Sequence, residues 1–169
     1  ASDVYKRQLF YLMKTLVKKL TRKKLRISFA ESCTGGGLAE ILTRLPGSSA
    51  WFECAFVTYS NDAKQKILGL TSDALQKFGE VSEETANAMS RGAVENSRAD
   101  YGVAITGVAG PDGGSESKPV GTVCLSWYKR GYGGINTRVF FNGDRLKIRE
   151  QSCLLAIQGL IDLLQNSSK

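Results

Sequence analysis

The sequence predicts an α/β fold: a single three-layer α/β/α sandwich with a mixed β-sheet. Three observations lead to this prediction. Short apolar runs alternate along the chain with segments whose apolar residues recur at helical spacing. The last two strand-like runs are separated only by a turn at residues 131–134, which predicts a hairpin and therefore an antiparallel pair. A length of 169 residues with a hydrophobic fraction of 42% suits one domain with its own core.

The individual elements follow from periodicity and from capping and breaking residues. Apolar residues from Leu9 to Leu20 recur at helical spacing, and Pro46-Gly47 ends a later apolar segment. Ser82 and Asp144 have side chains that favour a helix N-cap. The expected elements are helices over residues 9–24, 38–45 and 83–97, a short helix capped by Asn61, a long helix capped by Asp144, and strands over residues 25–30, 51–59, 101–106, 120–128 and 135–141.

The most informative segment is the hydroxyl- and glycine-rich turn AESCTGGG, residues 30–37, directly after the first apolar run. Such a turn brings backbone N–H groups and a side-chain nucleophile to one point, which is the arrangement that holds a developing oxyanion. Ser32 is the candidate nucleophile. The alternative is that Ser32 and Thr34 only cap the helix that follows. Cys33 is a second candidate nucleophile, but without an imidazole base we favour a packed thiol.

The chain contains no histidine, which excludes a Ser-His-Asp triad, so another group must activate Ser32. Tyr59 and Lys64 are candidates, because both follow a strand that ends at the same sheet edge as the glycine turn. A lysine acts as a base only when it is neutral. Its pKa must therefore fall from about 10.4 to about 7–8, which corresponds to about 4 kcal/mol from burial or a neighbouring cation. The alternative is that Lys64 is a solvated helix residue.

A second glycine-rich turn, residues 106–114, follows the strand over residues 101–106. It begins at Thr106, and its composition allows the backbone to approach a polar or anionic ligand closely. It matches neither a P-loop nor a Rossmann fingerprint, and a plain connecting loop is an equal alternative. Arg145, at the start of the last helix, is placed to bind a phosphate, and the alternative is a pair with a surface carboxylate.

Charge and cysteine usage exclude several classes of protein. The formal net charge is +7, but much of the excess lies in the first 26 residues, where it favours a solvated helix face. There is no zinc-finger, homeodomain or RRM signature, so nucleic acid is not an expected partner. No apolar run has the length of a membrane span. The four cysteines form no CxxC pair, so no metal is expected, and reduced thiols in a cytoplasmic protein are the simplest interpretation.

The first residues suggest a separate origin. Residues 3–8, DVYKRQ, match the translation of a transposon-end sequencing adapter. We therefore expect residues 1–8 to be an assembly scar, and we assign the functional domain to residues 9–169.

Six segments together resemble the C-terminal domain of the competence- and damage-inducible protein CinA. They are AESCTGG (30–36), PGSSAWF (46–52), VTYSNDAK (57–64), GEVSEET (79–85), AITGVAGPDGGSESKPVGTV (104–123) and FNGDR (141–145). The resemblance covers nearly the whole chain from residue 9 onward. It implies hydrolysis of the carboxamide of nicotinamide mononucleotide, a small nucleotide substrate, to nicotinate mononucleotide and ammonia.

The resemblance also implies roles for individual residues. Ser32 would be the nucleophile, Lys64 its base, and Tyr59 would relay or orient the proton. The remaining implied positions are the amides of Cys33, Thr34, Gly35 and Gly36 in an oxyanion pocket, Thr106, Gly107 and Gly110 along the nucleotide, and Arg145 at the phosphate. No cofactor is required, and a homo-oligomer, a dimer or larger, is expected.

Two other functions remain open at this point. One is a non-catalytic nucleotide-binding or regulatory module with a degraded site. The other is DNA binding through the basic first helix. That reading predicts salt-dependent binding that is lost when Lys18, Lys19, Lys23 and Lys24 are neutralised.

Overall fold

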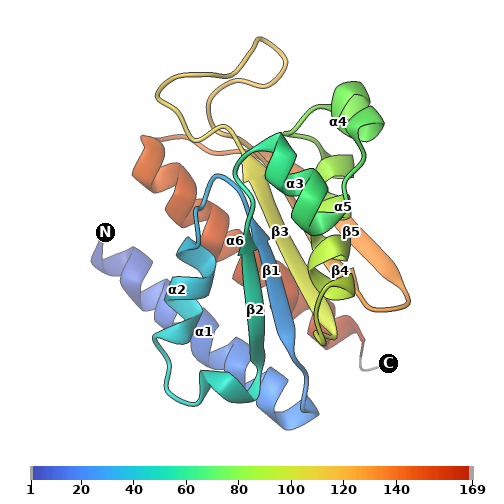
Figure 1. Cartoon of the computed structure of the whole chain (residues 1–169). Helices are drawn as coiled ribbons and strands as arrows, with labels where there is room; N and C mark the ends of the chain where they lie inside the picture. The colour runs from blue at the N-terminus through green and yellow to red at the C-terminus, as the bar shows by residue number, and fades with distance from the viewer. Residues whose placement is uncertain (1, 168–169) are drawn as a thin grey trace.

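A five-stranded mixed sheet forms the middle layer of the computed structural model, which describes residues 2–167 (Figure 1). The strands are β1 (Ile27–Glu31), β2 (Phe52–Val57), β3 (Tyr101–Gly107), β4 (Thr122–Lys129) and β5 (Gly133–Phe140). Their order across the sheet is β2-β1-β3-β4-β5. β1 runs parallel to β2 and β3, whereas β4 is antiparallel to β3 and β5. The predicted mixed sheet and its hairpin are confirmed.

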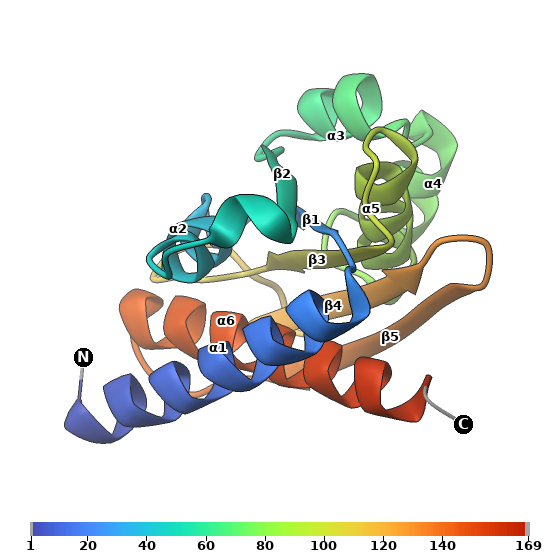
Figure 2. The same cartoon turned by 90° about the horizontal axis from the view of Figure 1, so that it is seen from below.

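Helices cover both faces of this sheet and complete the predicted sandwich (Figure 2). They are α1 (Asp3–Lys23), α2 (Gly37–Thr43), the short 3-10 helix η1 (Ser48–Ala50), α3 (Asn61–Leu68), α4 (Ser72–Phe78), α5 (Glu83–Glu95) and α6 (Arg145–Asn166). α1 and α6 pack together on one face, and α3, α4 and α5 lie on the other. The buried residues of α2 belong to the same hydrophobic cluster as those of α1 and α6.

Side chains alternate along β1 and so divide the core between the two faces. Phe29 belongs to the cluster shared with α1, α2 and α6, whereas its neighbour Ala30 packs with Met89 and Ala93 of α5. The N-caps predicted for the helices of the second half are confirmed, since Ser82 is the N-cap of α5 and Asp144 is the N-cap of α6.

The N-termini of two helices differ from the expectation. α1 begins at Asp3, inside the segment expected to be a scar, because Ser2 caps it and the residues that follow contain no glycine or proline. The origin of residues 1–8 stays a prediction. Ser60, not Asn61, is the N-cap of α3, because its backbone is extended and its hydroxyl accepts a hydrogen bond from the Ala63 N–H.

α4 had no counterpart in the sequence prediction. Its seven residues are too few to display a helical period, although Leu75 within it is buried. In the part of the chain that the structure describes, no helix is long and apolar enough to cross a membrane.

The carboxyl ends of the three parallel strands meet at one edge of the sheet. Glu31 pairs with Val57 on one side and with Ile105 on the other, so β1, β2 and β3 end close together. The connections from β1 to α2 and from β2 to α3, and the glycine-rich loop after β3, therefore leave the sheet side by side. This edge gathers the segments that carry the candidate residues.

Candidate active site

A pocket with a volume of about 260 Å³ opens at this edge. Its walls come from the three connections, from α3, from the connection between α4 and α5, and from the first residue of α6. The candidate residues that line it are Ser32, Cys33, Tyr59, Lys64, Thr106, Gly107, Gly110 and Arg145. A larger cavity of about 340 Å³ lies between α1, α2 and α6 and contacts Thr34, but neither Ser32 nor Lys64 lines it.

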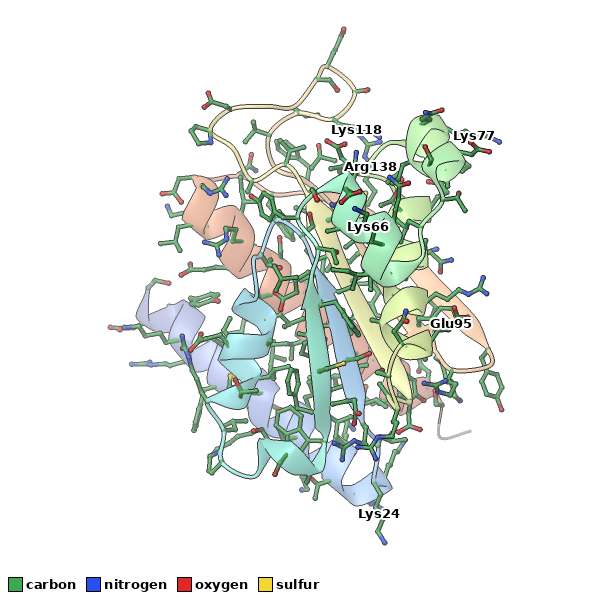
Figure 3. The ribbon with its side chains drawn as sticks, viewed as in Figure 1. Lys24, Lys66, Lys77, Glu95, Lys118 and Arg138 are labelled. Carbon is green, nitrogen blue, oxygen red and sulfur yellow. The ribbon has the colours of Figure 1, made fainter. Side chains whose placement is uncertain are left out.

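Ser32 and Lys64 meet inside this pocket. The Lys64 Nζ lies 3.2 Å from the Ser32 Oγ and 3.0 Å from the backbone carbonyl oxygen of Tyr59. Only 1% of the Lys64 surface is exposed, so its interpretation as a solvated helix residue is wrong. Lys66, two residues further along α3, shows the contrast: it lies on the outer surface of the helix and pairs with Asp62 (Figure 3).

Burial also changes the acidity of the Lys64 ammonium group. Loss of hydration lowers the pKa of Lys64 below its ordinary value of 10.5, while electrostatic interactions with Glu80 and, once it is ionised, Cys33 oppose this shift. A buried lysine with a lowered pKa holds its proton less tightly than a solvated one. Lys64 is therefore in a position and an environment where its neutral amine can accept the Ser32 hydroxyl proton.

The turn after β1 places Ser32 without using it as a helix cap. The Ser32 N–H donates to the carbonyl oxygen of Ile105 at 3.0 Å, which ties the serine to the end of β3. The N-cap of α2 is Gly36, whose φ of 95° is left-handed, and no side chain caps this helix at that position. The capping alternative for Ser32 and Thr34 is therefore wrong. Gly35 also has a positive φ, of 59°, which explains the consecutive glycines.

The backbone amides of the turn are not equivalent. The Gly35 N–H donates to the carbonyl oxygen of Ser32 at 3.0 Å and is thereby committed within the turn. The Cys33, Thr34 and Gly36 N–H groups have no acceptor among residues 2–167. Of these three residues Cys33 alone lines the pocket with Ser32, whereas Thr34 is fully buried, so the free amide that the turn brings to the pocket wall is that of Cys33.

Cys33 is a packed thiol in this site. Its side chain is buried, and loss of hydration raises its thiol pKa from 9.0 to about 12. A thiol with so high a pKa is not a thiolate at neutral pH, and the thiolate is the nucleophilic form. The choice of Ser32 over Cys33 as the candidate nucleophile follows.

Tyr59 and Arg145 form one wall of the pocket. The Arg145 Nη2 donates to the Tyr59 hydroxyl at 3.1 Å, and the Arg145 Nη1 donates to the carbonyl oxygen of Gly110 at 2.7 Å. The alternative of a surface carboxylate partner for Arg145 is therefore wrong. Within the described structure the Tyr59 hydroxyl bonds to neither Ser32 nor Lys64, and it is the Tyr59 carbonyl that contacts Lys64.

Thr106 fixes the neighbouring loop. It is 1% exposed, and its hydroxyl donates to the backbone carbonyl oxygen of Glu80 at 2.7 Å. Glu80 also lines the pocket and accepts a hydrogen bond from the Asn61 side chain, although no sequence motif singles it out. Glu80 lies just before α5, and it reaches this edge only because α3 and α4 fold across the sheet.

Comparisons with known proteins agree with this architecture. The family model described as CinA C-terminal domain matches residues 10–164. A protein named nicotinamide-nucleotide amidohydrolase PncC, from Pseudomonas putida, is 49% identical over 88% of this chain and 92% of its own length. The protein of the same name from Escherichia coli K12 is 45% identical over 95% of this chain and 98% of its own. A solved structure of the competence/damage inducible protein CihA from Agrobacterium tumefaciens has a TM-score of 0.89 at 41% identity, over 92% of this chain and 95% of that one.

Five of the six segments that carry the resemblance contribute residues to the pocket; PGSSAWF (46–52) does not. AESCTGG forms the end of β1 and its turn, VTYSNDAK forms the connection from β2 to α3, and FNGDR leads into α6. Sequence, fold and pocket thus point to one family. The chain belongs to the CinA C-terminal domain family.

Proposed function

We propose that this protein hydrolyses the carboxamide of nicotinamide mononucleotide to nicotinate mononucleotide and ammonia. The observation that carries the proposal is the buried contact of 3.2 Å between the Lys64 Nζ and the Ser32 Oγ, in a chain without histidine. The relatives named nicotinamide-nucleotide amidohydrolase give the substrate.

In the first half of the reaction, neutral Lys64 accepts the Ser32 hydroxyl proton while the Ser32 oxygen attacks the carboxamide carbon. The carbonyl oxygen becomes an oxyanion, which the free N–H groups of the turn stabilise, beginning with that of Cys33 at the pocket wall. Collapse of the tetrahedral intermediate breaks the carbon–nitrogen bond. The Lys64 ammonium returns its proton to the departing nitrogen, so ammonia leaves and an ester to Ser32 remains.

In the second half, water attacks this ester. Lys64 accepts one water proton, and the Ser32 oxygen takes that proton back as the acyl–oxygen bond breaks. The products are free Ser32 and the nicotinate carboxylic acid, which becomes the carboxylate by releasing its proton to solvent. The Lys64 Nζ takes part in every proton transfer, which is consistent with its buried contact with the Ser32 Oγ.

Tyr59 has an orienting role in this proposal. Its carbonyl oxygen accepts a hydrogen bond from the Lys64 Nζ, and this contact directs the amine towards Ser32. Its hydroxyl holds the Arg145 guanidinium at the mouth of the pocket. A proton relay through the Tyr59 hydroxyl, the other role implied by the resemblance, requires a contact with Ser32 or Lys64 that the pocket without ligand lacks.

The nucleotide occupies the wall formed by the glycine-rich loop after β3, with Gly107 and Gly110 allowing the backbone to approach it. Arg145 contacts the phosphate. Its guanidinium has five N–H donors, and the bonds to Gly110 and Tyr59 leave donors for a phosphate oxygen. The proposal keeps the cytoplasmic location and the homo-oligomer as predictions.

One assay tests the proposal. The purified protein is incubated with nicotinamide mononucleotide, and ammonia and nicotinate mononucleotide are measured together. Equal amounts of both products are expected, and the Ser32→Ala variant should release neither, while Ser49→Ala, an exposed serine of η1, should match the wild type. Binding of the nucleotide without turnover would contradict the enzyme and favour the regulatory module.

A further inference from the structure

We propose that Glu31 is a positioning residue: its buried carboxylate holds the turn that carries Ser32 and the free amides of Cys33, Thr34 and Gly36 in the reactive geometry. This inference rests on the proposed function and deepens it. Glu31 is the last residue of β1 and directly precedes the nucleophile. The mechanism described above gives it no role.

The burial of Glu31 is the first observation. Its side chain is 0% exposed, and the described residues give it no ion-pair partner. An unpaired carboxylate is strongly disfavoured in a protein interior unless hydrogen bonds replace its lost hydration. Such a group is therefore retained only where several donors converge on it.

Three donors converge on Glu31, and all of them belong to the turn or to the start of α2. The Thr34 hydroxyl and the Leu38 N–H donate to Oε1, each at 2.8 Å, and the Ala39 N–H donates to Oε2 at 3.1 Å. α2 has only Gly36 at its N-cap, so the carboxylate from the preceding strand replaces the missing cap. One side chain thereby spans the whole turn, from its strand to its helix.

The backbone carbonyl of Thr34 is held from a second direction. The Arg149 Nη2, from α6, donates to the Thr34 carbonyl oxygen at 3.0 Å, and the Gly37 N–H donates to the same oxygen at 2.9 Å. Thr34 is thus fixed through its hydroxyl by Glu31 and through its carbonyl by Arg149. These contacts set the orientation of the peptide groups on either side of Thr34, and the first of these groups carries the free Thr34 N–H and joins it directly to Cys33.

Glu31 does not act through the base. Glu80 and Cys33 are the groups whose electrostatic interactions raise the pKa of Lys64, and Glu31 is not one of them. Its loss should therefore weaken oxyanion stabilisation without moving the pH at which Lys64 becomes neutral. A lower kcat with an unchanged pH profile therefore distinguishes a positioning role of Glu31 from an effect on the pKa of Lys64.

The main test compares Glu31→Gln with Glu40→Gln, a control on α2, the helix that the Glu31 carboxylate caps; the Glu40 carboxylate pairs with Arg44 in solvent. Glutamine keeps one side-chain oxygen that can accept a hydrogen bond. In place of the second carboxylate oxygen it has an NH₂ group, which cannot accept from the donors that bonded to that oxygen. For Glu31→Gln we expect kcat to fall by about 10- to 100-fold, with KM and the acid limb of the pH profile unchanged. For Glu40→Gln we expect kcat within about twofold of the wild type.

A second pair of variants keeps the test valid if Glu31→Gln does not fold. Thr34→Val removes the hydroxyl donor at constant shape and should lower kcat by about tenfold, and Thr34→Ser should restore it. Faster hydrogen exchange of the Leu38 and Ala39 amides in Glu31→Gln gives a readout that needs no turnover.

The possible failures are distinguishable. If the wild type releases no ammonia from nicotinamide mononucleotide, the proposed function fails. If the wild type is active and Ser32→Ala is not, but Glu31→Gln or Thr34→Val keeps the wild-type kcat, only the role of Glu31 is overturned. A fall in kcat that matches the unfolded fraction in a thermal melt would also overturn it, because a purely structural residue behaves in that way.

Discussion

Two glycine-rich connections leave the same edge of the sheet, and they are held very differently. In the turn after β1, Ser32 is 7% exposed and Thr34 is fully buried, and contacts from β3, α2 and α6 fix its backbone. The loop after β3 extends away from the sheet (Figure 1), and residues 111–117 in it are all exposed.

This difference matches the two tasks of the proposed enzyme. Bond breaking requires a nucleophile and oxyanion donors fixed within a fraction of an ångström, whereas binding of a polar nucleotide tolerates an adaptable backbone. Changes in the turn should therefore lower kcat, and changes on the loop side should raise KM. The predictions below test that division, beginning with the largest effect.

One serine from each connection, Ser32 and Ser115, gives the sharpest contrast. Ser32→Ala should lower kcat by at least about 1,000-fold, because no other group can form the acyl ester. Ser115→Ala, in the exposed loop, should leave kcat within about threefold, because its hydroxyl bonds only within the loop. Steady-state kinetics on both variants measure this difference. Comparable losses of kcat in the two variants would contradict the division of tasks between the turn and the loop.

Lys64→Met should lower kcat at neutral pH by about 100- to 10,000-fold, the range of a general base. Lys66→Met, on the exposed side of α3, serves as its control and should stay near wild-type activity. Retention of the full rate by Lys64→Met would remove lysine as the base.

Lys64→Met also tests the energetic consequence of burying the base. Because the pKa of Lys64 is lowered on folding, the unfolded chain binds this proton more readily, and stability declines as the pH falls from 10.5 towards the folded pKa. Methionine cannot be protonated, so the variant does not undergo this loss of stability. At neutral pH its melting temperature should therefore equal or exceed that of the wild type. Thermal melts at pH 7 and above pH 10.5 should show the advantage shrinking at the higher pH.

Arg145→Gln should act on the loop side of the comparison. We expect KM to rise by about tenfold or more with kcat within about threefold, because the phosphate loses a charged contact and the Gly110 carbonyl loses its donor. Arg91→Gln, whose guanidinium pairs with Glu95 on the surface of α5, is the control. A fall in kcat at constant KM would place Arg145 with the catalytic turn instead.

Glu80→Gln should produce the smallest change, a displacement of the pH profile. The Glu80 charge raises the pKa of Lys64, so its removal lowers that pKa further. The acid limb of kcat/KM should then move to lower pH, since neutral Lys64 becomes available earlier. A shift to higher pH, or none, would contradict Lys64 as the titrating base.

Local sequence patterns determined much of this protein. The alternation of apolar runs with helical segments led to the mixed sandwich, and Ser82 and Asp144 marked helix starts correctly, because capping acts over three residues. AESCTGGG marked the candidate nucleophile Ser32, and the absence of histidine directed attention to Lys64 and Tyr59 as candidate bases. Helical periodicity did not predict α4, because seven residues are too few to display it.

Tertiary structure alone decided the chemistry between these segments. The Lys64 contact with Ser32 spans 32 positions, and the Arg145 contact with Tyr59 spans 86. Whether Lys64 is solvated or dry, where the Tyr59 hydroxyl points, and which amides of the turn are free depend on how helices pack across the sheet. Propensity and capping act within a few residues, whereas burial and hydrogen bonding between distant segments exist only once the core has formed.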